Sequence, residues 1–117
     1  MRPMGERRSL LASLTVLGHT VAFADRGETA IEAYREARVA GRPFDIVILD
    51  LTIRGGMGGV ETVGRLREID PAVKAIASSG YSDDATLSAF REQGFSAFLK
   101  KPYNIKQLQD TVSALLV

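Results

Sequence analysis

Four polar positions in the sequence carry the kinds of side chain that phosphoryl chemistry uses, and each follows a short apolar segment. They are Asp25, Asp50, Ser78 with Ser79, and Lys100 with Lys101. A carboxylate such as Asp50 can take up a phosphoryl group when a cation neutralises the incoming oxygens and a donor holds the product. Lys101 and Ser79 could fill these two roles. Taken singly, each residue also has an ordinary structural explanation: a carboxylate that caps a turn, a serine bonded to backbone, and a lysine in solvent.

The apolar segments before these polar residues are predicted to be strands of a parallel sheet. Residues 44–49 form a nearly continuous apolar run that ends at Asp50, as expected for a strand buried on both faces. Shorter runs of this kind lie at residues 19–24, 73–78 and 97–99. In open α/β sheets, reactive groups collect at the carboxyl ends of the strands. We therefore expect Asp50, Ser79 and Lys101 to meet in one pocket.

Apolar residues at helical spacing predict five helices around these four strands. Their inner faces are carried by Leu10, Leu11, Leu14 and Leu17; by Ile31, Tyr34 and Ala37; by Val63, Leu66 and Ile69; by Leu87 and Phe90; and by Ile105, Leu108, Val112 and Leu115. Asp25 with Glu28, and Asn104 with Gln107, have the spacing of capping boxes. This order predicts a doubly wound parallel α/β sheet in one domain over residues 1–117. A leading helix with no strand before it implies that one strand of the sheet is absent.

Composition excludes several classes of function. The net charge of +1 gives no reason to expect a nucleic-acid or membrane partner, and the absence of cysteine removes disulfides, thiolate metal sites and cysteine nucleophiles. No apolar run is long enough to cross a bilayer and the first residues lack a signal peptide, so the cytoplasm is the expected location. The single histidine, His19, argues against a histidine kinase, a phosphotransfer protein or an imidazole-based zinc enzyme.

The polar segments together resemble the receiver domains of two-component signalling. The matching stretches, in the same order, are Asp50-Leu51-Thr52-Ile53, the glycine-rich loop of residues 55–59, Ser78-Ser79-Gly80-Tyr81-Ser82, and Phe98-Leu99-Lys100-Lys101-Pro102-Tyr103. The similarity covers nearly the whole chain and is greatest to receivers attached to hybrid histidine kinases. It implies a flavodoxin-like receiver fold.

The resemblance also implies roles for individual residues. Asp50 matches the phosphoacceptor, Ser79 the hydroxyl that turns toward the phosphoryl group, and Lys101 the ammonium that pairs with it. Asp50 and the backbone carbonyl of Thr52 match ligands of a magnesium ion. Phe98 matches the aromatic residue whose rotation reports activation. The Lys101-Pro102 bond matches a peptide bond that is cis in the family, which proline permits at low cost.

The sequence departs from the family at its beginning. Family members start with an apolar strand that ends in two acidic residues, and that pair would fall near Met1 and Arg2. Without those carboxylates, magnesium binding should be weakened. The strand at 19–24 could pair directly with 44–49, which would bring Asp25 closer to Asp50 as a substitute magnesium ligand. Alternatively, a second copy of the chain could complete the sheet as a homodimer.

Three functions follow from these features. The first is a phosphorelay receiver: Asp50 takes phosphate from the phosphohistidine of a histidine kinase or a histidine phosphotransfer domain and switches a protein-interaction face. The second is a docking module that works without phosphorylation, which the departure at Met1 and Arg2 favours. The third, ranked last, is a hydrolase with an aspartyl intermediate. Haloacid-dehalogenase-like enzymes carry a second aspartate two residues after the nucleophile, where this chain has Thr52. We therefore do not expect an enzyme.

Overall fold

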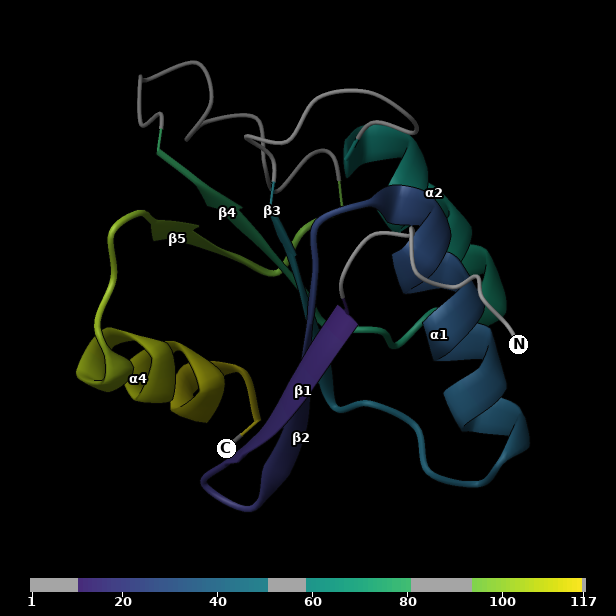
Figure 1. Cartoon of the computed structure of the whole chain (residues 1–117), viewed down its shortest axis with the longest axis horizontal. Helices are drawn as coiled ribbons and strands as arrows, with labels where there is room; N and C mark the ends of the chain where they lie inside the picture. Colours follow the sequence, from purple (N-terminus) through teal and green to yellow (C-terminus); the bar gives the residue numbers. More distant parts are fainter. Residues whose placement is uncertain (1–10, 51–58, 81–93, 117) are drawn as a thin grey trace, which may run out of the picture.

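The sheet has five strands in the order β1-β2-β3-β4-β5. The computed structural model describes residues 11–50, 59–80 and 94–116. The strands span Leu11–Val16 (β1), His19–Ala24 (β2), Ile46–Asp50 (β3), Ala75–Ser79 (β4) and Ala97–Lys100 (β5). Strands β2 to β5 are parallel, whereas β1 runs antiparallel to β2 (Figure 1). All four predicted strands are therefore present, with one further strand at the edge.

Helices cover both faces of this sheet. Helices α1 (Gly27–Val39) and α2 (Gly59–Ile69) pack on one face, and α4 (Ile105–Leu116) packs on the other (Figure 1). The side chains of β3 alternate between the two layers: Val47 and Leu49 join the cluster under α1 and α2, while Ile46 and Ile48 join the cluster under α4. The near-continuous apolar run of this strand is thereby explained by burial on both faces.

The prediction of a helix at Leu10–Leu17 is wrong for the residues described. This segment forms β1 and a two-residue turn to β2, because Val16 pairs with His19 and both turn residues have positive φ, +53° at Leu17 and +85° at Gly18. Such a type I′ turn matches the twist of a hairpin. The predicted helix with Leu87 and Phe90 lies outside the described residues. Within the described ranges the fold thus has five strands and three helices, in place of the four strands and five helices expected.

Direct pairing of β2 with β3, one of the two arrangements considered from the sequence, is found. Ala24 is the register partner of Leu49, so the chain leaves both strands at the same end of the sheet. At the other end, the Asp45 N–H donates to the Thr20 carbonyl oxygen at 2.8 Å, and the Thr20 N–H donates to the Asp45 carboxylate at 2.8 Å. These two bonds fix the register and carry Asp25 and Asp50 to one edge.

Of the two predicted capping boxes, one is confirmed. The Asn104 N–H donates to the Gln107 side chain at 2.9 Å, and the Gln107 N–H donates to the Asn104 side chain at 2.8 Å, at the start of α4. The box at Asp25 is wrong, because α1 has Arg26 as its N-cap and no side chain caps it. Asp25 is thus one residue too early to cap α1.

A partly buried hydrogen-bonded group joins α1 to the end of α2. The Tyr34 hydroxyl donates to the Asp70 carboxylate at 2.8 Å, and the Arg38 guanidinium lies 2.9 Å from the same carboxylate oxygen. The Tyr34 ring is 2% exposed. This group holds the helical layer at the end of the sheet opposite Asp50. Among the described helices, none combines the length and apolar character needed to cross a membrane.

Candidate phosphoryl-acceptor site

Asp50 and Lys101 form an ion pair at the carboxyl end of the sheet. The Lys101 Nζ donates to the Asp50 Oδ2 at 2.7 Å, and the side chains are 37% and 23% exposed, respectively. Asp50 is the last residue of β3 and Lys101 directly follows β5, so the contact reaches across the end of β4. The Lys101 N–H donates to the Ser79 carbonyl oxygen at 2.8 Å, which ties this backbone to β4. Two of the three predicted site side chains are therefore in contact.

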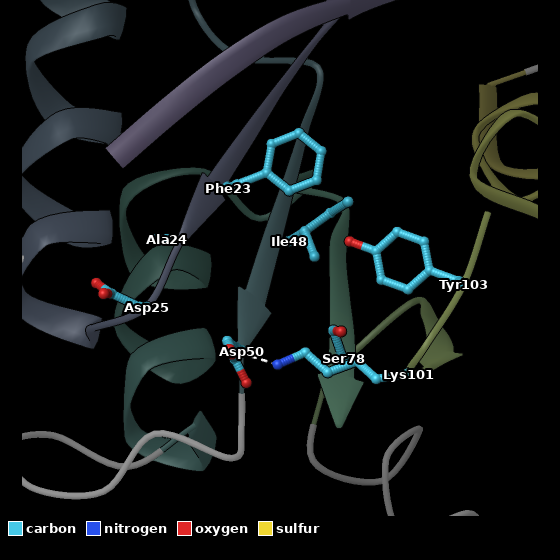
Figure 2. Close-up of a pocket in the computed structure, with 8 residues that line it drawn as sticks. All are labelled: Phe23, Ala24, Asp25, Ile48, Asp50, Ser78, Lys101 and Tyr103. Carbon is cyan, nitrogen blue, oxygen red and sulfur yellow. Dashed lines mark hydrogen bonds and ion pairs between the residues drawn. The ribbon is translucent and has the colours of Figure 1, made fainter. Parts of the chain in front are cut away.

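The pair lies at the edge of a pocket of about 250 Å³ (Figure 2). The walls are formed by strand residues from β2, β3 and β4 and by the segment after β5. They are Phe23, Ala24, Asp25, Ile48, Asp50, Ser78, Lys101 and Tyr103. Phe23 and Ile48 contribute apolar side chains to the lining, and Asp50 and Lys101 contribute the charged pair (Figure 2). Because both side chains are partly exposed, solvent screens part of the attraction between the two charges.

Ser78, rather than Ser79, lines this pocket. Ser78 is the register partner of Asp50, and strand alternation places it on the α4 face with Ile76. Ser79 is also buried, at 3% exposed, but alternation places it on the face of Ala75 and Ala77. Two adjacent serines occur in the sequence, and no local pattern distinguishes which of them lines the pocket. The predicted role of Ser79 toward a phosphoryl group stays a prediction.

Tyr103 is a pocket residue to which the sequence interpretation gave no role in the chemistry. Burial, the largest effect, raises the pKa of its phenol; Lys101 lowers the pKa, Asp50 raises it, and the nearby Ser78 hydroxyl lowers it. The Ser78 Oγ is buried and has no hydrogen bond of good geometry among the described residues. The phenol thus remains a neutral donor, turned into the pocket above Ser78 (Figure 2). Its position directly after the Lys101-Pro102 pair was the only available signal.

Asp25 reaches the same edge but its carboxylate is turned elsewhere. It lines the pocket at the end of β2, yet Figure 2 shows its oxygens directed away from the pair formed by Asp50 and Lys101. Its Oδ1 is buried and lacks a hydrogen-bond partner in the part of the chain described. Two carboxylates that end adjacent strands are hard oxygen donors of the type that Mg²⁺ takes. No group of three or more acidic, histidine or cysteine side chains able to hold a metal occurs in the described ranges.

The remaining predicted residues lie around this site. Phe98 is half-buried and packs against the cluster under α1 and α2, so it lies on the opposite face of β5 from Leu99. The Lys101-Pro102 peptide bond is cis. Thr52 falls outside the described residues. The switch role of Phe98 and the metal role of Thr52 are therefore expectations from the resemblance.

The parallel α/β sheet with helices on both faces, and with Asp50 and Lys101 in contact at its carboxyl edge, places the chain in the doubly wound α/β class. Comparison with known proteins identifies the family. Residues 6–113 match the response regulator receiver domain. The chain belongs to this family.

Curated relatives place such domains in proteins of different length. The chain is 34% identical over 93 residues to the response regulator receiver protein Anae109_2439 of Anaeromyxobacter sp. (strain Fw109-5), covering 80% of this chain and 37% of that protein. It is 35% identical over 99 residues to the sensor kinase CckA of Brucella abortus (strain 2308), covering 85% of this chain and 10% of the kinase. The chain therefore spans well under half of either relative.

Solved structures agree with the fold. A two-component response regulator of the LuxR family from Aurantimonas sp. SI85-9A1 superposes with a TM-score of 0.66 at 28% identity, over 80% of this chain and 62% of that chain. The CheX-CheY-BeF3-Mg+2 complex from Borrelia burgdorferi gives a TM-score of 0.68 at 24% identity, over 79% and 66%. The domain is thus a receiver of two-component signal transduction.

Proposed function

We propose that Asp50 accepts a phosphoryl group from the phosphohistidine of a histidine kinase or a histidine phosphotransfer domain. The observation that carries this proposal is the 2.7 Å contact between Lys101 Nζ and Asp50 Oδ2 at converging strand ends. An incoming phosphoryl group brings negative charge to the carboxylate, and a cation already held there stabilises that charge without moving far. No residue on the described surface is needed as an acid or base in this step.

The transfer exchanges one bond to phosphorus for another. An Asp50 carboxylate oxygen attacks the phosphorus and the phosphorus–nitrogen bond of the donor histidine breaks. The donor ring, already protonated on its other nitrogen, takes the bonding electron pair and leaves as neutral imidazole. Lys101 then moves its contact from the carboxylate to the phosphoryl oxygens. The buried hydroxyl of Ser78 and the Tyr103 phenol are the donors in the pocket that would bond to the product, whereas the role of Ser79 comes from the resemblance alone.

Mg²⁺ would contribute charge neutralisation and in-line positioning when bound. Asp50 would supply one oxygen ligand, the Thr52 carbonyl a second by resemblance, and Asp25 a third if its side chain turned toward Asp50. The unpartnered buried Oδ1 of Asp25 supports such a rotation, because a ligand would compensate a buried oxygen that lacks a bond. The Borrelia burgdorferi complex, which shares this fold, contains BeF3 and Mg+2.

A docking module that works without phosphorylation is the second candidate. It is favoured by the absence, within the described ranges, of a group of three or more acidic, histidine or cysteine side chains that could hold a metal. In that case the ion pair would be a fixed structural contact. The receiver would then contribute a protein-binding surface only.

Incubation with acetyl phosphate and Mg²⁺, followed by intact mass measurement, separates the two. The relay proposal expects a gain of one phosphoryl group on the parent chain, none on Asp50→Asn, and an unchanged gain on Asp110→Asn. Asp110 is a suitable control because it is exposed on α4, where it pairs with Lys106. Absence of an adduct on the parent chain at saturating donor and Mg²⁺ would leave the docking module as the better account.

A further inference from the structure

The outer edge of β1 lacks the features that normally protect an edge strand. All six residues from Leu11 to Val16 pair with β2 in unbroken register, so no bulge bends the strand, and they include no charge and no proline. Charges, prolines, bulges and short length are the usual means by which edge strands avoid pairing with other chains. The opposite edge does have them: β5 is four residues long, ends at the exposed Lys100 and continues into Lys101 and Pro102.

The hairpin geometry identifies the backbone groups that point outward. In a two-residue hairpin the closing pair, Val16 with His19, exchanges both hydrogen bonds, and such pairs alternate along the strands. Val16 and Leu14 therefore bond to β2, and the N–H and C=O groups of Leu11, Ser13 and Thr15 point away from the sheet. The hydrogen bond of Thr20, the register partner of Thr15, agrees with this alternation. The Thr20 carbonyl accepts from the Asp45 N–H, so the backbone of Thr20 points away from β1 and this pair is not hydrogen-bonded across the hairpin.

We propose that this edge pairs with β1 of a second copy of the chain, antiparallel and with the twofold axis at Ser13. In this register Ser13 faces Ser13 of the second copy, and Leu11 faces Thr15. All three outward-pointing residues of each copy then exchange hydrogen bonds. The result is one continuous sheet with five strands from each copy.

A second copy is the occupant favoured by the composition of the edge. An uncharged strand pairs with itself without repulsion, and an antiparallel twofold pairing closes on itself without producing a filament. It also covers an exposed apolar side chain: Leu14, which is 45% exposed, falls opposite Ala12 of the second copy. Asp50 lies on β3, two strands from this edge, so pairing of the edges and phosphorylation are separate events and can fail separately.

Sedimentation equilibrium of the full chain over a concentration series tests the proposal. The parent chain should rise from 12.7 kDa toward twice that mass. Ser13→Lys places two ammonium groups opposite each other at the axis and should keep the chain monomeric. Val39→Lys is the matched control, because it adds the same charge at a side chain that is 86% exposed on α1, and it should dimerise like the parent. A parent chain that stays monomeric up to its solubility limit, or equal dimerisation of both variants, overturns the proposal.

Cross-linking provides a second readout that does not depend on how the lysine variant folds. The chain has no cysteine, so Ser13→Cys introduces a single thiol. A short bifunctional thiol reagent should join two copies through Ser13→Cys in high yield and through Val39→Cys only at the background level. Identical yields from the two positions would contradict pairing at β1, whether or not the chain dimerises through another surface.

Discussion

The substitution Leu17→Asn tests the hairpin that the sequence pattern failed to predict. Leu17 has φ of +53°, a left-handed conformation that costs a leucine about 1–2 kcal/mol and that asparagine adopts far more readily. The leucine side chain is 56% exposed, so its replacement loses only part of the roughly 1.5–3 kcal/mol that full burial of a leucine contributes. We expect Leu17→Asn to stabilise the chain by about 0.3–0.7 kcal/mol.

Urea unfolding followed by circular dichroism measures this change, and Leu17→Ala is the control. Alanine removes the same apolar side chain but keeps the left-handed strain, so the expected order of stability is Asn, then Leu, then Ala. With an m-value of about 2 kcal/mol/M, the urea midpoint of Leu17→Asn should rise by roughly 0.2–0.3 M. A helix over the same residues predicts the reverse order, because alanine is the best helix former and asparagine a poor one. An alanine variant more stable than the asparagine variant would refute the hairpin.

Further consequences concern the ion pair, the buried tyrosine and the cap of α4. Lys101→Gln should slow phosphorylation of Asp50 by acetyl phosphate about 10-fold or more, because it removes the cation that faces the phosphoryl group; intact mass against time gives the rate. The temperature of thermal unfolding should change little, because the ion pair is partly exposed. Tyr34→Phe should lower stability by about 1–2 kcal/mol in urea unfolding, because it removes the hydrogen bond to a charged acceptor. Burial, as the largest cause, raises the pKa of Tyr34 from 10.0 to about 12, so the unfolded chain releases this proton at lower pH than the folded chain. The free energy of unfolding should therefore decline between about pH 10 and 12, and Tyr34→Phe should lessen this decline. The hydrogen bond from Tyr34, as the largest cause, lowers the pKa of Asp70. The stability that Asp70 contributes above its ordinary pKa of 3.8 should therefore be lost as the pH falls below that value. In Asp70→Asn, urea midpoints should decline less at acid pH. Asn104→Ala should cost about 1 kcal/mol in the same assay by removing the cap of α4.

The parallel strands could be predicted from the sequence because their burial leaves a direct trace in it. β3 and β4 are covered on both faces, so they appear as apolar runs, and the predicted strand at 19–24 coincides with β2. The α4 cap was equally visible, since Asn104 and Gln107 interact over three residues. Local signals of this kind do not depend on the rest of the fold.

The hairpin could not be predicted because its leucines fit two structures. Leu10, Leu11, Leu14 and Leu17 have helical spacing, but the segment pairs with β2, and only the positive φ of Leu17 and Gly18 distinguishes the turn. Strand pairing depends on neighbours that are distant from this local pattern. The same argument applies to the two serines, because the face that each takes depends on the register of β4 against β3.

At the site, convergence was predictable and orientation was not. The meeting of Asp50 with Lys101 follows from the rule that parallel strand ends share an edge. The direction of the Asp25 carboxylate and the inward position of the Tyr103 phenol depend on side-chain packing against β2 and β4. No spacing in the sequence encodes those orientations.

Chemical trapping of the phosphorylated chain tests the assignment of Asp50 most directly. Borohydride reduces an aspartyl phosphate to homoserine, and peptide mass spectrometry after treatment with acetyl phosphate and Mg²⁺ locates the converted residue. We predict homoserine at position 50 and nowhere else, with about a tenth as much or less in the Lys101→Gln variant at early times. A phosphate that survives reduction and maps to Ser79, Tyr103 or another hydroxyl would contradict the proposal that the Asp50 carboxylate is the acceptor.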